Sequence, residues 1–235
     1  MPDVDAATRL RTERDRVVAD TRRRGAAFGA ALADVCDAIL AETAATLTLK
    51  GRWSVIVAGS YARRELCPGS DLDVVLIHGG GARGRDAESA ARTLWYPFWD
   101  AGFSLGQATR TPKEALALAD DDLDALTALL DIRLVAGDKD FAFELRDKAR
   151  ALAAKRRGRV IDALASASSA RYERPGPVAE MVEPNVKEGA GGLRALSLAE
   201  ALRIDDHAPQ GRRGFTWVRL SAATERANGE DPRLS

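Results

Sequence analysis

The segment from Val57 to Ile77, "VAGSYARRELCPGSDLDVVLI", constrains the fold and chemistry of this chain more than any other. Asp71 and Asp73 flank Leu72 at the head of an apolar run that is typical of a buried strand. Because residues two apart on a strand point to the same face, both carboxylates project together while Leu72 packs on the other face. Two unpaired carboxylates at this spacing would repel each other, and burying them would be costly. A bound divalent cation would remove both problems.

The pattern favours magnesium bound to a nucleotide phosphate. Magnesium usually takes one or two carboxylates and fills its other positions with water and substrate phosphate. Upstream, a Gly-Ser turn leads into a short helix whose first N–H groups and serine hydroxyl could bind a phosphate. Either piece alone is common without a site, so the prediction depends on their order and spacing. The predicted site residues are Asp71 and Asp73 as metal ligands, with Gly59, Ser60 and Arg63 at the nucleotide.

Composition narrows the class of protein. With 46% hydrophobic residues in 235, the chain can bury a sizeable core as one large domain or two small ones. Lys and Arg total 35 and Asp and Glu also total 35, so no net charge selects nucleic acid or a membrane surface. Only Cys36 and Cys67 are present, and no signal peptide or membrane-length apolar run is seen. We therefore expect a soluble, cytoplasmic protein.

Periodicity and turn residues predict an alternation of helices and strands. Thr111 and Glu114 have the spacing of a capping box, Pro112 suits the first helical position, and Gly137 is a plausible stop. The expected strands are Trp53–Ala58, Asp71–Ile77 and Phe103–Thr109. The expected helices are one or two within residues 4–49, then Tyr61–Leu66, Asp86–Tyr96 ended or kinked by Pro97, a run from Thr111 to Gly137, and about Lys139–Ser169.

Several segments together carry a family resemblance. The pair Gly59-Ser60 followed by Asp71-x-Asp73 resembles the signature of the DNA polymerase β-like nucleotidyltransferase superfamily. Four segments look, in this order, like the N-terminal part of the uridylyltransferase that modifies the P-II nitrogen-regulatory protein: "GSYARRELCPGSDLDVVLIH", "LWYPFWDAGFSLG", "ATRTPKEALALADDDLDALTALLDIRLVAGD" and "KEGAGGLRAL". The resemblance covers most of residues 50–200 and is most similar to actinobacterial versions.

The resemblance implies both a fold and a reaction. The fold would be α+β, with a polymerase β-like core on a small mixed sheet, flanked by N- and C-terminal helices. Residues 1–50 would be a helical segment, 51–136 the nucleotidyltransferase core, and 137–235 a C-terminal helical region with a poorly ordered tail. A tyrosine hydroxyl of P-II would attack the α-phosphate of UTP or ATP, releasing pyrophosphate, with magnesium neutralising charge.

The sequence departs from the family pattern in three places. Relatives usually carry a further acid on the strand matched by Phe103–Thr109, where this chain has Ser104 and Gly106 at the two plausible positions. Ala195 stands where an aspartate commonly follows the Gly-Gly-Leu-Arg run. The hydrolase and sensing domains of relatives do not follow, so the chain is not expected to remove the nucleotide group or to sense glutamine.

These departures keep alternatives open. A degenerate paralogue could retain nucleotide or P-II binding without turnover, since the third carboxylate is absent. A nucleotidyltransferase with another acceptor would share the acid pair but would not explain the "KEGAGGLRAL" match. The active nucleotidyltransferase is the preferred hypothesis because the front half of its site is intact.

Overall fold

The computed structural model describes residues 4–80 and 84–173 and divides the chain into two compact units, Met1–Leu152 and Ala153–Ser235. The first unit carries the sheet and every predicted site residue. The second contributes the helix α8 (Arg157–Glu173) to the described residues. The expected "KEGAGG" loop and poorly ordered tail lie outside the described residues, and the three-part division of the chain stays a prediction.

Two helices precede the sheet, as the apolar spacing predicted. They are α1 (Val4–Ala19) and α2 (Ala26–Ala45). The alanine-rich α2 buries one face, on which Leu32, Cys36 and Leu40 lie at three- and four-residue spacing. Burial raises the pKa of the Cys36 thiol to about 12, so this cysteine is a protonated packing residue and not a nucleophile.

The sheet has four strands in the order β3-β2-β1-β4. They are β1 (Trp53–Ala58), β2 (Leu72–His78), β3 (Leu105–Arg110) and β4 (Arg133–Gly137). β1 is antiparallel to β2 and β4, whereas β2 and β3 are parallel. At one edge of the sheet, the end of β1 therefore lies beside the beginnings of β2, β3 and β4. The predicted site residues lie at this edge.

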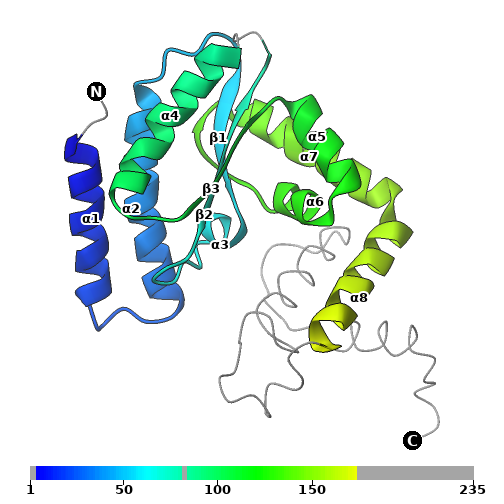
Figure 1. Cartoon of the computed structure of the whole chain (residues 1–235), viewed down its shortest axis with the longest axis horizontal. Coiled ribbons are helices and arrows are strands. Elements are labelled where there is room, and N and C mark those ends of the chain that lie inside the picture. Colours follow the sequence, from blue (N-terminus) through cyan, green and yellow to red (C-terminus); the bar gives the residue numbers. More distant parts are fainter. Residues whose placement is uncertain (1–3, 81–83, 174–235) are drawn as a thin grey trace, which may run out of the picture. The chain divides into compact units, whose positions relative to one another are not determined.

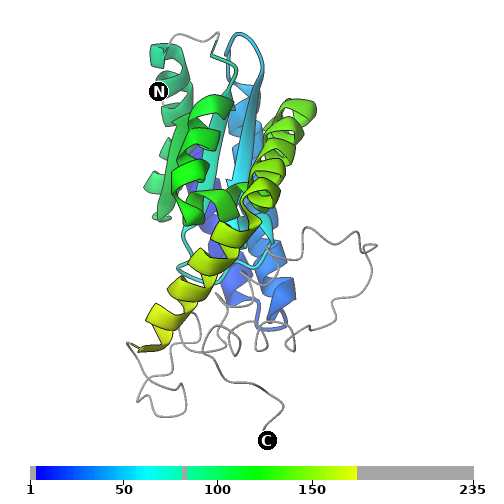
Figure 2. The same ribbon diagram turned by 90° about the vertical axis from the view of Figure 1, so that its right-hand side faces the viewer.

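Helices cover both faces of this sheet (Figure 1). On one face lie α1, α2 and α4 (Gly84–Asp100), and in both views the other face carries α5 (Pro112–Asp121), α6 (Leu123–Leu130) and the part of α7 (Lys139–Lys155) that belongs to the first unit (Figure 2). Leu72, Val74 and Leu76 of β2 are buried against the first group of helices. The predicted α+β class, with a small mixed sheet and flanking helices, is confirmed.

Two helices differ from the sequence-based prediction. The short helix α3 (Gly59–Ala62) begins at Gly59, so the predicted Gly-Ser turn is its first two residues. Gly59 has a φ of 60°, which lets the chain leave the extended Ala58 without an intervening turn. Helix α4 continues through Pro97 to Asp100. A proline in a helix costs about 3 kcal/mol, and the burial of Trp95 and Phe98 around it offsets this cost.

The region from Thr111 to Gly137 is partly as predicted. The capping box is confirmed, because Thr111 Oγ1 accepts from the Glu114 N–H at 3.3 Å and Glu114 Oε2 accepts from the Thr111 N–H at 2.7 Å. Pro112 is the first residue of α5. The prediction of one continuous helix is wrong. Asp122 is extended and caps a second helix, α6, and the chain then forms β4. Gly137 ends a strand and not a helix.

The predicted helical run from about 139 to 169 is divided into α7 and α8. None of the described helices is long and apolar enough to cross a membrane.

Candidate active site

The two predicted metal ligands lie at the start of β2. Asp71 directly precedes the strand and Asp73 is its second residue. Both are exposed, whereas Leu72 and Val74 between and after them are buried in the core. This alternation puts the two carboxylates on the face opposite the core residues, as the period of a strand predicted. The apparently costly burial of two acids therefore does not occur.

Glycines enclose the Asp73 carboxylate on two sides. In the strand register Asp73 is paired with Ala58 of β1 and with Gly106 of β3. A Cβ atom at position 59 would lie 2.9 Å from Asp73 Oδ2, and a Cβ at position 106 would overlap Asp73 Oδ1. The side chain of Asp73 thus occupies space that any larger residue at Gly59 or Gly106 would need.

The structure shows what lies at the two positions, Ser104 and Gly106, where relatives usually carry a third acid. Within residues 4–80 and 84–173, no group of three His, Cys, Asp or Glu side chains is placed to hold a metal ion. An acid at position 106 would overlap Asp73 as it now lies. Ser104 is exposed at the head of β3, where its carbonyl accepts from the Leu72 N–H at 2.9 Å. Two carboxylates with water and phosphate are a sufficient ligand set for magnesium, so the donors present fit that ion.

The helix α3 presents Gly59 and Ser60 at the same edge of the sheet. Its backbone bonds run from the Arg63 N–H to the Gly59 carbonyl at 3.2 Å and from the Glu65 N–H to the Ser60 carbonyl at 2.8 Å. With only four residues it has little macrodipole. A phosphate here would therefore depend on individual N–H groups and on the Ser60 hydroxyl.

Arg63 follows α3 and is engaged by two carboxylates. Its Nη1 lies 2.8 Å from Asp131 Oδ2 and its Nε lies 2.9 Å from Glu65 Oε2. Burial alone would lower the pKa of this guanidinium, but the hydrogen bonds to Asp131 and Glu65 raise it above its usual value. Arg63 is therefore charged and held beside α3, and a phosphate would have to share or replace its present partners.

Two further residues tie α3 to the rest of the first unit, and neither was predicted from the sequence. Asp37 of α2 accepts a two-pronged hydrogen bond from Arg133, the first residue of β4, at 2.7 and 3.1 Å. Arg133 also donates to the carbonyls of Tyr61 and Ala62, both at 3.1 Å. The β-branched Ile132 and Val135 were a signal for a strand here, but the apolar run before them continued the helical pattern.

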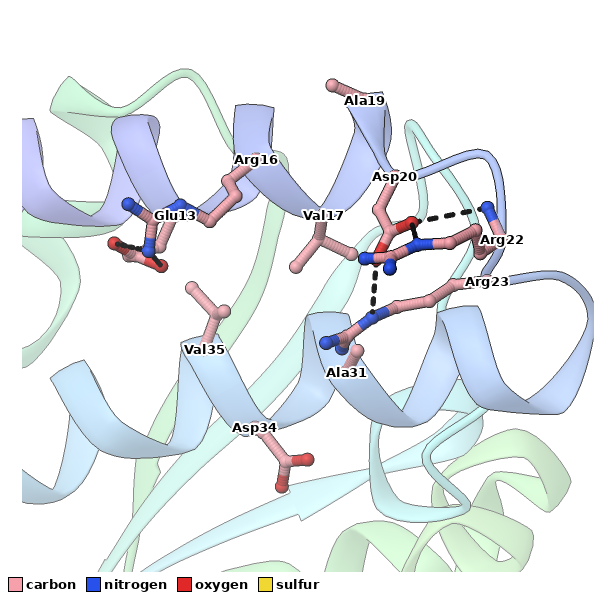
Figure 3. A pocket seen from close by; sticks show the side chains of 10 residues that line it. All are labelled: Glu13, Arg16, Val17, Ala19, Asp20, Arg22, Arg23, Ala31, Asp34 and Val35. Carbon is pink, nitrogen blue, oxygen red and sulfur yellow. Dashed lines mark hydrogen bonds and ion pairs between the residues drawn. The ribbon is translucent and has the colours of Figure 1, made fainter.

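A cavity of about 660 Å³ lies elsewhere, between α1 and α2 (Figure 3). Its arginines face acids that also line it: Arg22 and Arg23 both donate to Asp20, and Arg16 pairs with Glu13. Hydrogen bonds from Arg22 lower the pKa of Asp20 to about 2. Since these cations are already neutralised, the cavity offers no built anion site.

Comparison with known proteins supports the resemblance predicted from the motifs. No family model matches the chain. It is 40% identical over 159 residues to the bifunctional uridylyltransferase/uridylyl-removing enzyme of Corynebacterium glutamicum, a match that covers 68% of this chain and 22% of that protein. Proteins of the same name match from Mycobacterium tuberculosis, at 39% identity over 65% of this chain and 19% of the relative, and from Streptomyces coelicolor, at 36% identity over 91% and 25%.

The matched part is a fraction of each relative, because the chain spans at most 25% of the length of these three proteins. A crystal structure of a toxin-antitoxin with AMP-PNP also aligns with this chain, at 12% identity and a TM-score of 0.34, over 52% of this chain and 94% of the other. That likeness is too weak to support an argument. The sequence matches confirm that this chain resembles a region of the bifunctional uridylyltransferase/uridylyl-removing enzymes.

Proposed function

We propose that this chain transfers UMP or AMP from a nucleoside triphosphate to a tyrosine of the P-II signalling protein, in the cytoplasm. The observation that carries the proposal is the exposed Asp71 and Asp73 pair at the sheet edge, with Asp73 enclosed by Gly59 and Gly106. The names of the matched relatives supply the reaction class. The choice of P-II as acceptor comes from the family resemblance.

The residues have distinct roles in this reaction. Asp71 and Asp73 would hold magnesium, which supplies charge neutralisation for the triphosphate when it is bound. The N–H groups at the start of α3 and the Ser60 hydroxyl would bind phosphate oxygens, and Arg63 would add positive charge. The tyrosine oxygen forms a bond to the α-phosphorus, the bond from that phosphorus to the pyrophosphate oxygen breaks, and the hydroxyl proton passes to water or a nearby base. Catalysis would come mainly from positioning and charge.

The test is transfer of label from α-labelled UTP or ATP to P-II protein in the presence of magnesium. We expect wild-type labelling to be lowered at least about 100-fold by Asp71→Asn, because electrostatic stabilisation by a metal is worth several kcal/mol. Thermal unfolding should be unchanged, since Asp71 is exposed. Asp86→Asn is the matched control, because Asp86 is an exposed acid in the first turn of α4.

Two outcomes would contradict the proposal. If neither UTP nor ATP gave transfer to P-II, the proposed activity would be excluded. If Asp71→Asn kept full activity, Asp71 would be excluded as a metal ligand. Titration calorimetry then separates the alternatives, because magnesium-dependent nucleotide binding without pyrophosphate release would identify a binding module that does not turn over.

A further inference from the structure

We infer that Arg133 and Asp37 form a positioning pair that fixes helix α3, and with it Gly59 and Ser60, against the metal-binding edge of the sheet. The inference rests on the proposed function, because it assigns the pair a purpose at the nucleotide site. Neither residue is expected to touch the nucleotide. Both lie on elements that the sequence motif does not include: α2 and β4.

A single guanidinium makes four hydrogen bonds that join three elements. Nη1 and Nη2 of Arg133 donate to the two carboxylate oxygens of Asp37, at 2.7 and 3.1 Å. Nε donates to the Ala62 carbonyl and Nη2 also donates to the Tyr61 carbonyl, both at 3.1 Å. The planar fork of arginine suits this two-sided arrangement, which a lysine could not reproduce.

The carbonyls that Arg133 binds belong to the last two residues of α3. A helix of one turn is not stable by itself, because its nucleation fixes several dihedral angles for few hydrogen bonds. Its last carbonyls also need hydrogen-bond donors from outside the helix. Arg133 supplies two of these hydrogen bonds, so β4 and α2 support α3 in addition to its contacts with β1 and β2.

The surroundings of the pair restrict its movement. Tyr61 is fully buried and the Arg133 guanidinium lies 5.4 Å from the centre of its ring. The side chains of Arg133 and Asp37 are only 26% and 21% exposed, so salt and water screen their attraction less than that of a surface pair. Arg64 adds a second cation to the same acid, at 3.5 Å from Asp37, and also binds Asp34.

The beginning of β4 holds α3 and the residue after it at two points. Asp131, two residues before Arg133, binds Arg63 at 2.8 Å, while Arg133 binds the α3 carbonyls. Loss of the Arg133 contact would remove one of these two attachments from the turn that carries Gly59, the glycine that lies against Asp73. We therefore expect a change in Arg133 or Asp37 to weaken nucleotide binding without removing any group that contacts the nucleotide.

Arg133→Lys in the full chain is the main test, with Asp37→Asn as a second variant in case the first does not fold. Arg52→Lys is the matched control, because Arg52 makes a similar two-pronged bond to Asp138 at the other end of the sheet. The first readout is amide hydrogen exchange at Arg63 and Arg64, whose N–H groups donate to the Gly59 and Tyr61 carbonyls. The second is the Kd of magnesium–UTP and magnesium–ATP by calorimetry, with KM and kcat of transfer.

In both variants we expect exchange at these amides to rise at least about tenfold and the nucleotide Kd and KM to rise by a similar factor, since each variant weakens charge-assisted hydrogen bonds, which are about twice as strong as neutral ones. The kcat value should change less, and Arg52→Lys should alter none of these quantities. Unchanged exchange in α3, or faster exchange with an unchanged nucleotide Kd, would overturn the inference. A wild-type chain that binds no nucleotide would instead contradict the proposed function and also the purpose assigned to the pair, while the exchange data would still show whether the pair holds α3.

Discussion

The two ends of the sheet use glycine for different purposes. At the end where β1 begins, Gly137 has a φ of 95° and lies against the neighbouring strand. A Cβ there would come within 2.9 Å of Ser54 Cα and of Trp53 Cε3. At the opposite end of the sheet, a Cβ atom added at Gly59 or at Gly106 would come within 3 Å of one group only, the carboxylate of Asp73. Glycine makes room for packed backbone at one end and for the carboxylate of Asp73 at the other.

Each end also has an arginine engaged by acids, and again the surroundings differ. Arg52 binds Asp138 and Glu144 with its side chain 45% exposed, and it joins the start of β1 to α7 and the residue before it. Arg133 is less exposed, and two of its four hydrogen bonds go to backbone carbonyls of α3. The first cluster therefore stabilises a junction at the surface, whereas the second defines the position of a short helix. Substitutions that are chemically alike should have unlike effects at the two ends.

Gly137→Ala should produce the largest loss of stability. We expect a loss of about 3 kcal/mol in the free energy of unfolding, because a positive φ and overlap with packed neighbours each cost about 1–3 kcal/mol. Urea unfolding measures this value. Gly51→Ala is the control, because Gly51 has a φ of 85° with nothing near its missing Cβ and should lose only the conformational part. Equal losses in the two variants would show that close packing at Gly137 is not the cause.

Gly106→Ala should reduce transfer activity more than stability, unlike Gly137→Ala. The added methyl group displaces only the end of the flexible Asp73 side chain, so stability should fall by less than about 1 kcal/mol. Transfer should fall about tenfold, because Asp73 is a proposed metal ligand and small displacements of such a group are costly. Label transfer to P-II and urea unfolding of the same sample test both parts. A loss of stability as large as that of Gly137→Ala, with transfer unchanged, would remove the distinction between the two ends.

The smallest effect concerns pH at the Arg52 end. Hydrogen bonds from Arg52 and from the Phe141 N–H lower the pKa of Asp138 from 3.8 to about 2. Because the folded value is the lower one, this carboxylate contributes stability above about pH 4 that is lost as the pH falls towards 2. Asp138→Asn should therefore reduce stability at neutral pH and flatten its decline between these values. The urea midpoints of the wild-type chain and of Asp138→Asn at pH 6, 4 and 3 measure this difference. If stability declined with pH in parallel in both proteins, the lowered pKa of Asp138 would be contradicted.

The strands and the acid pair were predictable because their signals are local. Short apolar, β-branched runs bounded by turn residues identified β1 and β2. The period of two of a strand placed Asp71 and Asp73 on one face. The capping box at Thr111 and Glu114 was equally clear, since both of its hydrogen bonds join residues three apart. These features depend only on neighbours along the chain.

The errors arose where distant residues decide the outcome. Pro97 was expected to end or kink α4. The helix does not end there but runs on to Asp100, with Trp95 and Phe98 buried on either side of the proline. The strand β4 was missed because its preceding apolar residues continue a helical period, while its identity comes from pairing with β1. The periodicity of one sequence contains no information on that pairing.

Local sequence was enough to predict a strand that carries two carboxylates on one face behind a Gly-Ser pair, because side-chain direction on a strand follows from its period. It could not predict that Gly106 lies against Asp73 or that Arg133 and Asp37 hold α3. Those contacts arise only in the folded chain, because strand register and the packing of α2 against β4 join residues far apart along it. The direction of the acids is therefore a local property, whereas the shape of the site around them comes from long-range packing.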